Sequence, residues 1–91
     1  MIADRHHPAM PSWLRDRGYR FGIRAADCHE PPHVHVRGHG GAAKIWLATL
    51  GVANVKGYNR RELAVVLSIV FQHRPPFLEK WREFCGPIAE E

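Results

Sequence analysis

The sequence predicts an α+β protein, in which an antiparallel sheet of three to four strands is followed by two C-terminal helices packed on one face. Three observations support this class. Apolar and polar side chains alternate with period two through the first half of the chain. Apolar residues recur at helical spacing in the last third, and strands followed by helices are typical of α+β folds. At 91 residues, the chain has the length of one small domain.

The first two strands are expected at residues 12–15 and 19–25, joined by a turn at 16–18. In the second strand, apolar side chains alternate with Arg20 and Arg24. Because successive side chains on a strand point to opposite faces, this strand has one apolar face and one basic face.

Two further strands are expected on either side of a glycine-rich hairpin connection. Residues 33–37, with the sequence HVHVR, alternate strictly, and AKIWL follows at 43–47 after GHGG at 38–41. Residues 50–56 are a candidate for a short extra strand.

The helical part is expected to begin after Asn59, which has the spacing of a capping box with Glu62. The first helix covers residues 60–73 and stops before two prolines, and the second covers 76–85. The side chains expected in the core are Phe21, Ile23, Val34, Val36, Ile45, Leu47, Leu63, Leu67 and Val70.

Composition places the chain among ordinary folded proteins, with 45% hydrophobic and 24% charged residues. Residues 1–9 are interpreted as a flexible tail, and 10–91 as the domain. No apolar stretch is long enough to span a bilayer, and the N-terminus lacks a secretory signal. Cys28 and Cys85 form no CxxC pair, so free thiols and a cytoplasmic location are expected.

The chain carries a formal charge of +4, and ten of its thirteen basic residues are arginine. Arginine favours phosphate and carboxylate recognition because its planar fork donates paired hydrogen bonds. The charge therefore allows a nucleic acid or an acidic protein as partner.

The histidines of HEPPHVHVRGH at 29–39 are placed by strand register. If 38–41 form a four-residue loop, His35 lies opposite Lys44 and His33 lies opposite Trp46, and every apolar residue meets an apolar partner. The apolar face is then covered by the helices. The predicted polar face carries Arg20, Arg24, His33, His35, Lys44 and Trp46.

Several functions fit this polar face. It is either a solvated surface, or a protein-binding surface with Trp46 and the arginines as anchors. It also fits an RNA-binding face, in which Arg20, Arg24 and Lys44 contact phosphates and Trp46 stacks on a base.

Two chemical hypotheses concern the paired histidines. In a ribonuclease, His33 and His35 are the candidate catalytic residues for proton transfer. In a metal site, the same two histidines bind an ion with His29, Glu30 or His39 as a further ligand. Because HxH alone is a weak metal signature, we expect neither a metal nor another cofactor.

Read in order, RGYRFGIRAAD, EPPHVHVRG, AKIWL, YNRREL and FLEKWREF resemble the small bacterial domain-of-unknown-function 4160 family over about residues 10–85. The family's genes often lie beside those of another small family, as in toxin–antitoxin pairs. The resemblance implies a module of that kind, and a fold-level analogy with small toxins that have a catalytic strand histidine. A protein partner encoded by a neighbouring gene is the first expectation. RNA binding, ribonuclease activity, metal binding and a homodimer are the alternatives. The expected binding residues are Arg20, Arg24, Glu30, Lys44 and Trp46.

Overall fold

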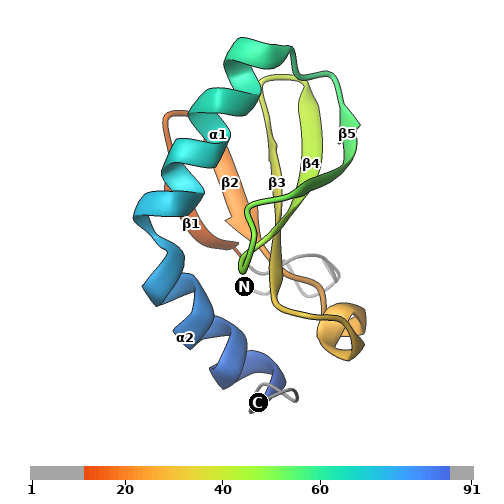
Figure 1. The fold of residues 1–91 in the computed structure, drawn as a ribbon, viewed down its shortest axis with the longest axis vertical. Coiled ribbons are helices and arrows are strands. Elements are labelled where there is room, and N and C mark those ends of the chain that lie inside the picture. The colour runs from red at the N-terminus through yellow and green to blue at the C-terminus, as the bar shows by residue number, and fades with distance from the viewer. Residues whose placement is uncertain (1–11, 87–91) are drawn as a thin grey trace, which may run out of the picture.

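The computed structural model describes residues 12–86, in which five antiparallel strands form one sheet in the order β1-β2-β3-β4-β5 (Figure 1). The strands are β1 (Ser12–Asp16), β2 (Tyr19–Gly22), β3 (His33–Gly38), β4 (Gly41–Trp46) and β5 (Val52–Lys56). The fold is α+β with two C-terminal helices, but the predicted number of three to four strands is wrong. Both edge strands are interrupted by a register shift, which weakens their alternating pattern in the sequence. The predicted tail at 1–9 lies outside the described residues.

Three helical segments complete the described part of the chain: the short 3-10 helix η2 (Ala25–His29), α1 (Arg60–Gln72) and α2 (Arg74–Cys85). The capping box that begins α1 is confirmed. The Asn59 side chain accepts a hydrogen bond from the Glu62 N–H at 2.8 Å, and the Glu62 carboxylate accepts one from the Asn59 N–H at 2.9 Å. His73 caps both helices, so the chain turns sharply from α1 into α2.

The predicted residue pairs of the central hairpin are confirmed, but the four-residue loop is wrong, because Gly38 also pairs with Gly41 and leaves a two-residue turn. His33 pairs with Trp46, Val34 with Ile45 and His35 with Lys44, through to Arg37 with Ala42. Because a slip of one residue would turn the valines of β3 toward solvent, burial of one face fixes this register.

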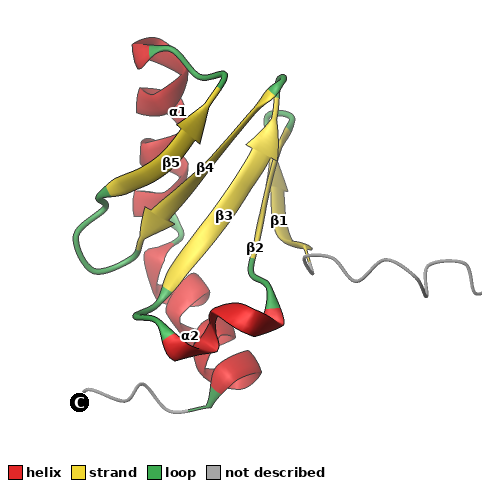
Figure 2. Cartoon of the chain, turned by 90° about the vertical axis from the view of Figure 1, so that its right-hand side faces the viewer, coloured by secondary structure: helices red, strands yellow, loops and turns green. Residues whose placement is uncertain are grey.

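The core lies between one sheet face and α1, as Figure 2 shows with α1 behind the strands. From the sheet it contains Phe21, Val34, Val36, Ile45 and Leu47, all fully buried. The helices add Val66, Ile69, Val70 and Phe77. The expected core positions Leu63 and Leu67 are only half-buried. The helix is rotated so that Val66 and Ile69 face the sheet, and burying each such side chain contributes about 1.5–3 kcal/mol.

The lower end of the sheet is closed by η2 and by the second half of α2, which lie beside each other in both views (Figures 1 and 2). A disulfide joins Cys28 of η2 to Cys85 of α2, with a Cα–Cα distance of 5.3 Å. The expectation of free thiols is therefore wrong, because folding brings together two cysteines that are 57 residues apart. In the described part of the chain, no helix is both long and apolar enough to cross a membrane.

Tyr58 ties the segment before α1 to the β3–β4 hairpin, because its hydroxyl donates a hydrogen bond to the Gly38 carbonyl at 2.9 Å. Burial, followed by the neighbouring Tyr19 and Glu62, raises the pKa of Tyr58 to about 12 from an ordinary 10.0. A raised pKa means that the folded protein keeps a proton that the unfolded chain releases. The stabilisation is therefore complete below pH 10 and is lost as the pH rises through 10 toward 12.

We expect Tyr58→Phe to lower the free energy of unfolding at pH 7 by about 0.5–1.5 kcal/mol, because one hydrogen bond is lost. Between pH 10 and 12 the variant should lose less stability than the parent, since its ring does not ionise. Urea denaturation across this range measures both effects. The pKa of Tyr19 is also raised by burial, so both proteins should still lose some stability over this range. An equal loss of unfolding free energy in the two proteins would contradict the assignment to Tyr58.

Candidate functional site on the outer sheet face

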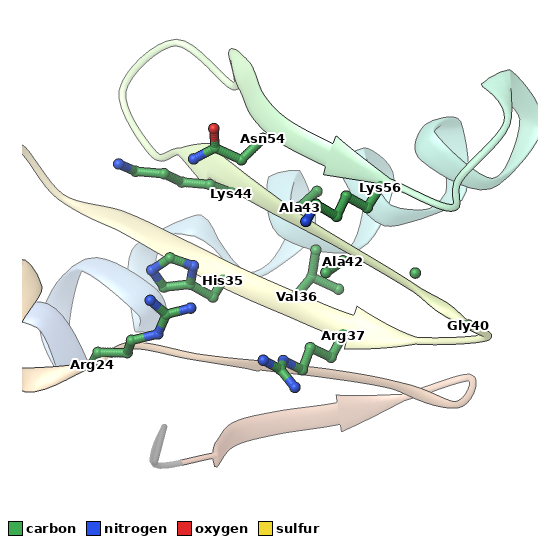
Figure 3. A pocket seen from close by; sticks show the side chains of 11 residues that line it. Arg24, His35, Val36, Arg37, Gly40, Ala42, Ala43, Lys44, Asn54 and Lys56 are labelled. Atoms are coloured by element: carbon green, nitrogen blue, oxygen red, sulfur yellow. The ribbon is translucent and has the colours of Figure 1, made fainter. Parts of the chain in front are cut away.

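We call the sheet face opposite α1 the outer face. Its central feature is a pocket with a volume of about 460 Å³ over strands β3, β4 and β5 (Figure 3). The charged and polar side chains that line it are Arg24, His35, Arg37, Lys44, Asn54 and Lys56. The remaining lining residues are glycines, alanines and Val36, so the floor of the pocket is flat and its rim is basic.

The register shift in β5 turns two polar side chains toward this pocket. Ala42 pairs with Lys56 and Lys44 pairs with Ala53, so two residues of β5 lie against one residue of β4. Asn54, in the shifted segment, has a φ of 51°, in the left-handed region that asparagine tolerates better than most residues. Figure 3 shows Asn54 and Lys56 on the same side of the sheet as Lys44. The bulge thereby extends the basic rim onto the edge strand.

Most basic side chains of the outer face have no acidic partner among the described residues. Within residues 12–86, no carboxylate forms an ion pair with Arg20, Arg24, Arg37 or Lys56. Arg20 and Arg37 pair directly across β2 and β3, and both are exposed. Like charges at directly opposed positions destabilise a sheet. An anion bound between them would relieve this repulsion.

Lys44 and Trp46 are less available than the sequence analysis expects. Lys44 contacts Glu30 at 2.6 Å between Nζ and Oε1, and its Nζ lies 4.4 Å from the centre of the Trp46 ring. This hydrogen bond lowers the pKa of Glu30. Trp46 is half-buried and its ring centre is 5.1 Å from that of His33. The tryptophan is thus packed against the protein on one side and covered by the lysine on another.

Below the pocket, Asp27 of η2 reaches the histidines of β3. His35 Nε2 donates a hydrogen bond to Asp27 Oδ2 at 2.8 Å. The backbone N–H of Arg24 donates to the same oxygen at 3.2 Å, which fixes the carboxylate at the start of η2. Donor atoms of Asp27, His33 and His35 all lie within 4.8 Å of one another.

His33 is buried, which corrects its predicted position on an accessible face. The strand alternation is as expected, but η2 and α2 cover this end of the outer face. The side chain is 0% exposed, and its ring centre lies 5.2 Å from that of Trp81 on α2. Its Nδ1–H donates to the Pro31 carbonyl at 2.9 Å, whereas its Nε2 has no hydrogen-bond partner. The catalytic role expected of His33 would require η2 or α2 to move away from this ring.

The pKa values of Asp27 and His35 are both lowered, which favours an ionised carboxylate and a neutral imidazole in this hydrogen bond. Burial lowers the pKa of His35, and the charge of Arg24 adds to this effect, while Asp27 opposes it. For Asp27, burial raises the pKa, but the hydrogen bonds from His35 and Arg24 with the nearby imidazoles outweigh it, so the pKa is lowered. A neutral imidazole therefore donates to an ionised carboxylate.

The structure brings together some of the residues expected from the sequence and separates others. Arg24, His35 and Lys44 line one pocket, and Glu30 contacts Lys44. The catalytic assignment of His33 and His35 remains a prediction. Of the suggested third metal ligands, His39 instead contacts the Arg17 carbonyl at the far end of the hairpin. The same region contains four residues that were not expected from the sequence: Asp27, Arg37, Asn54 and Lys56. Arg37 has the same strand parity as His35, a signal that could have identified it.

Comparison with known proteins assigns the family. The model of the family described as "Domain of unknown function (DUF4160)" matches residues 18–82, and the chain belongs to this family. No curated protein and no solved structure gives a significant match.

Asp27 is held near β3 by η2, and η2 is joined to α2 by the disulfide. We expect the double substitution Cys28→Ser and Cys85→Ser to lower the free energy of unfolding by up to about 4 kcal/mol, from the entropy of closing a long loop. Hydrogen exchange of the Glu30 N–H, which donates to the Asp27 carbonyl, should also accelerate. Urea denaturation and amide exchange measure the two effects. Equal stability and equal exchange would show that η2 is held without the disulfide.

Proposed function

We propose that the outer face binds RNA through the sugar–phosphate backbone. The observation that carries this proposal is a cluster of exposed basic side chains around one pocket that have no acidic partner among the described residues, namely Arg24, Arg37 and Lys56. Phosphate contacts supply most of the sequence-independent affinity of proteins for nucleic acids. Arginine forks match phosphate oxygens, and the flat floor of glycine and alanine leaves room for a strand.

The packing of Trp46 indicates which part of the RNA is recognised. Single-strand binding proteins with base contacts stack bases on accessible aromatic rings. Here the pocket lining contains no phenylalanine, tyrosine or tryptophan, and Trp46 is covered by Lys44. Binding is therefore expected to depend on charge and to show little preference among base sequences.

The matched variants are Arg37→Ala and Lys56→Ala on the outer face, with Arg61→Ala and Lys80→Ala on the exposed surfaces of the helices as controls. Titration of a short labelled RNA at several salt concentrations should give a slope of about −3 in log affinity against log salt. Four phosphate contacts produce this value at about 0.7 each. Each outer-face variant should reduce the slope by about 0.7, and the controls should not change it. No RNA binding at low salt, or equal loss in the controls, would refute the proposal.

Glu30 provides a test in the opposite direction. In the free protein its carboxylate accepts a hydrogen bond from Lys44, so Glu30→Gln should release the lysine for a phosphate. We expect tighter RNA binding and a slope that is about 0.7 more negative. Lys44→Ala should cancel the gain when combined with Glu30→Gln. Unchanged affinity in Glu30→Gln would place Lys44 outside the binding surface.

We also propose a protein partner, encoded by a neighbouring gene in a toxin–antitoxin-like module. The structural feature that favours a partner is β5, which forms one edge of the sheet and carries an exposed Val55 beside Lys56. Exposed edges can accept a strand from another chain. Co-expression with the neighbouring gene, followed by competition with RNA, tests the two proposals together. If the Val55→Lys variant forms the complex as well as the parent protein does, the β5 edge is not the interface.

A cytoplasmic location is part of the same proposal, and the disulfide makes it testable. Disulfides persist mainly in oxidising compartments. Trapping of thiols in freshly lysed cells would show whether Cys28 and Cys85 are paired where the protein acts.

A further inference from the structure

We infer that Asp27, His33 and His35 form a binding site for a divalent transition-metal ion, with Zn²⁺ as the probe of choice. The site goes beyond the proposed RNA-binding surface, because none of the four unpaired basic residues is a ligand. Its donors are one carboxylate oxygen and two imidazole nitrogens, a set that suits Zn²⁺ and its first-row neighbours better than Mg²⁺ or Ca²⁺.

The distances fit a single ion. Metal–ligand bonds of about 2.0–2.1 Å at tetrahedral angles separate the ligand atoms by about 3.3 Å. Asp27 Oδ2 lies 2.8 Å from His35 Nε2 and 3.4 Å from His33 Nε2. These two distances are within about 0.5 Å of the required separation. The donor nitrogens of His33 and His35 lie within 4.8 Å of each other, so a rotation of the partly exposed His35 ring brings all three donors to one ion.

His33 supplies the independent observation that points to a ligand. It is fully buried, and its Nδ1–H is fixed by the Pro31 carbonyl, so in the neutral ring Nε2 carries a lone pair. This lone pair has no hydrogen-bond donor near it and points toward the Asp27 carboxylate, which is also an acceptor. Buried acceptors without partners are costly. A histidine whose other nitrogen donates to a backbone carbonyl is the usual arrangement of a metal ligand.

The three side chains supply every electron pair that the ion needs from the protein. The ion takes the lone pair of His33 Nε2, one oxygen of Asp27, and the lone pair of His35 Nε2. His35 frees that lone pair by losing its Nε2 proton to solvent and taking one up at Nδ1, so the ring stays neutral and no net proton is released. Three protein ligands leave a fourth position for water, as in zinc sites that perform chemistry. The fourth position distinguishes this site from closed structural zinc sites.

The experiment uses the full chain without an affinity tag. Calorimetric titration with ZnCl₂ should show one ion per chain, and MgCl₂ should show none. Asp27→Asn and His35→Ala should abolish stoichiometric binding. The matched controls are His29→Ala, on the same helical segment but outside the cluster, and the double substitution His6→Ala and His7→Ala, which removes adjacent histidines able to chelate metal. Both controls should retain one ion.

A second measurement does not depend on the folding of variants. In the unaltered protein, imidazole nitrogen spectra should show a Zn²⁺-dependent shift of His33 Nε2 while Nδ1 stays protonated. Binding that survives Asp27→Asn and His35→Ala, or disappears with His6 and His7, would overturn the inference. An unshifted His33 Nε2 at saturating zinc would do the same.

Discussion

Strand β3 contributes side chains both to the hydrophobic core and to the polar outer face, and the arrangement of the other elements depends on this alternation. Its valines supply the centre of the core, whereas its histidines and Arg37 face the other way. Because side chains on a strand alternate, neither set can move without displacing the other. Packing against α1 therefore also fixes where His35 stands, about one strand spacing from Lys44 on β4. The hydrophobic core positions the polar site.

The outer face divides into two electrostatic regions. Toward β5 and the hairpin, cations accumulate without acidic partners among the described residues. Toward η2, the carboxylates of Asp27 and Glu30 face His35 and Lys44. The first region attracts anions, and the second collects donors suited to a cation. Since His35 belongs to both, an ion at one region would alter the field at the other.

Sequence reasoning succeeded where one periodic constraint decided the outcome. Alternation and burial were sufficient to predict the β3–β4 pairing, and Asn59 with Glu62 was sufficient to predict the start of α1. It failed where several segments meet in space. The position of Asp27 depends on a 3-10 helix and on a distant cysteine, and the burial of His33 depends on the direction of α2 after His73. The fifth strand was expected only as a candidate at residues 50–56, because its bulge interrupts the alternation.

The bond between Cys28 and Cys85 makes a covalent ring from most of the molecule. The ring encloses β3, β4, β5 and both long helices, while β1 and β2 remain on an open arm. A protease that cuts the exposed hairpin at His39 or Gly40 would therefore produce two pieces that migrate as one until a reductant is added. The same linkage means that β3 and α2 cannot drift apart even when the sheet loosens. Topology thus limits how far the buried histidine can travel from its neighbours.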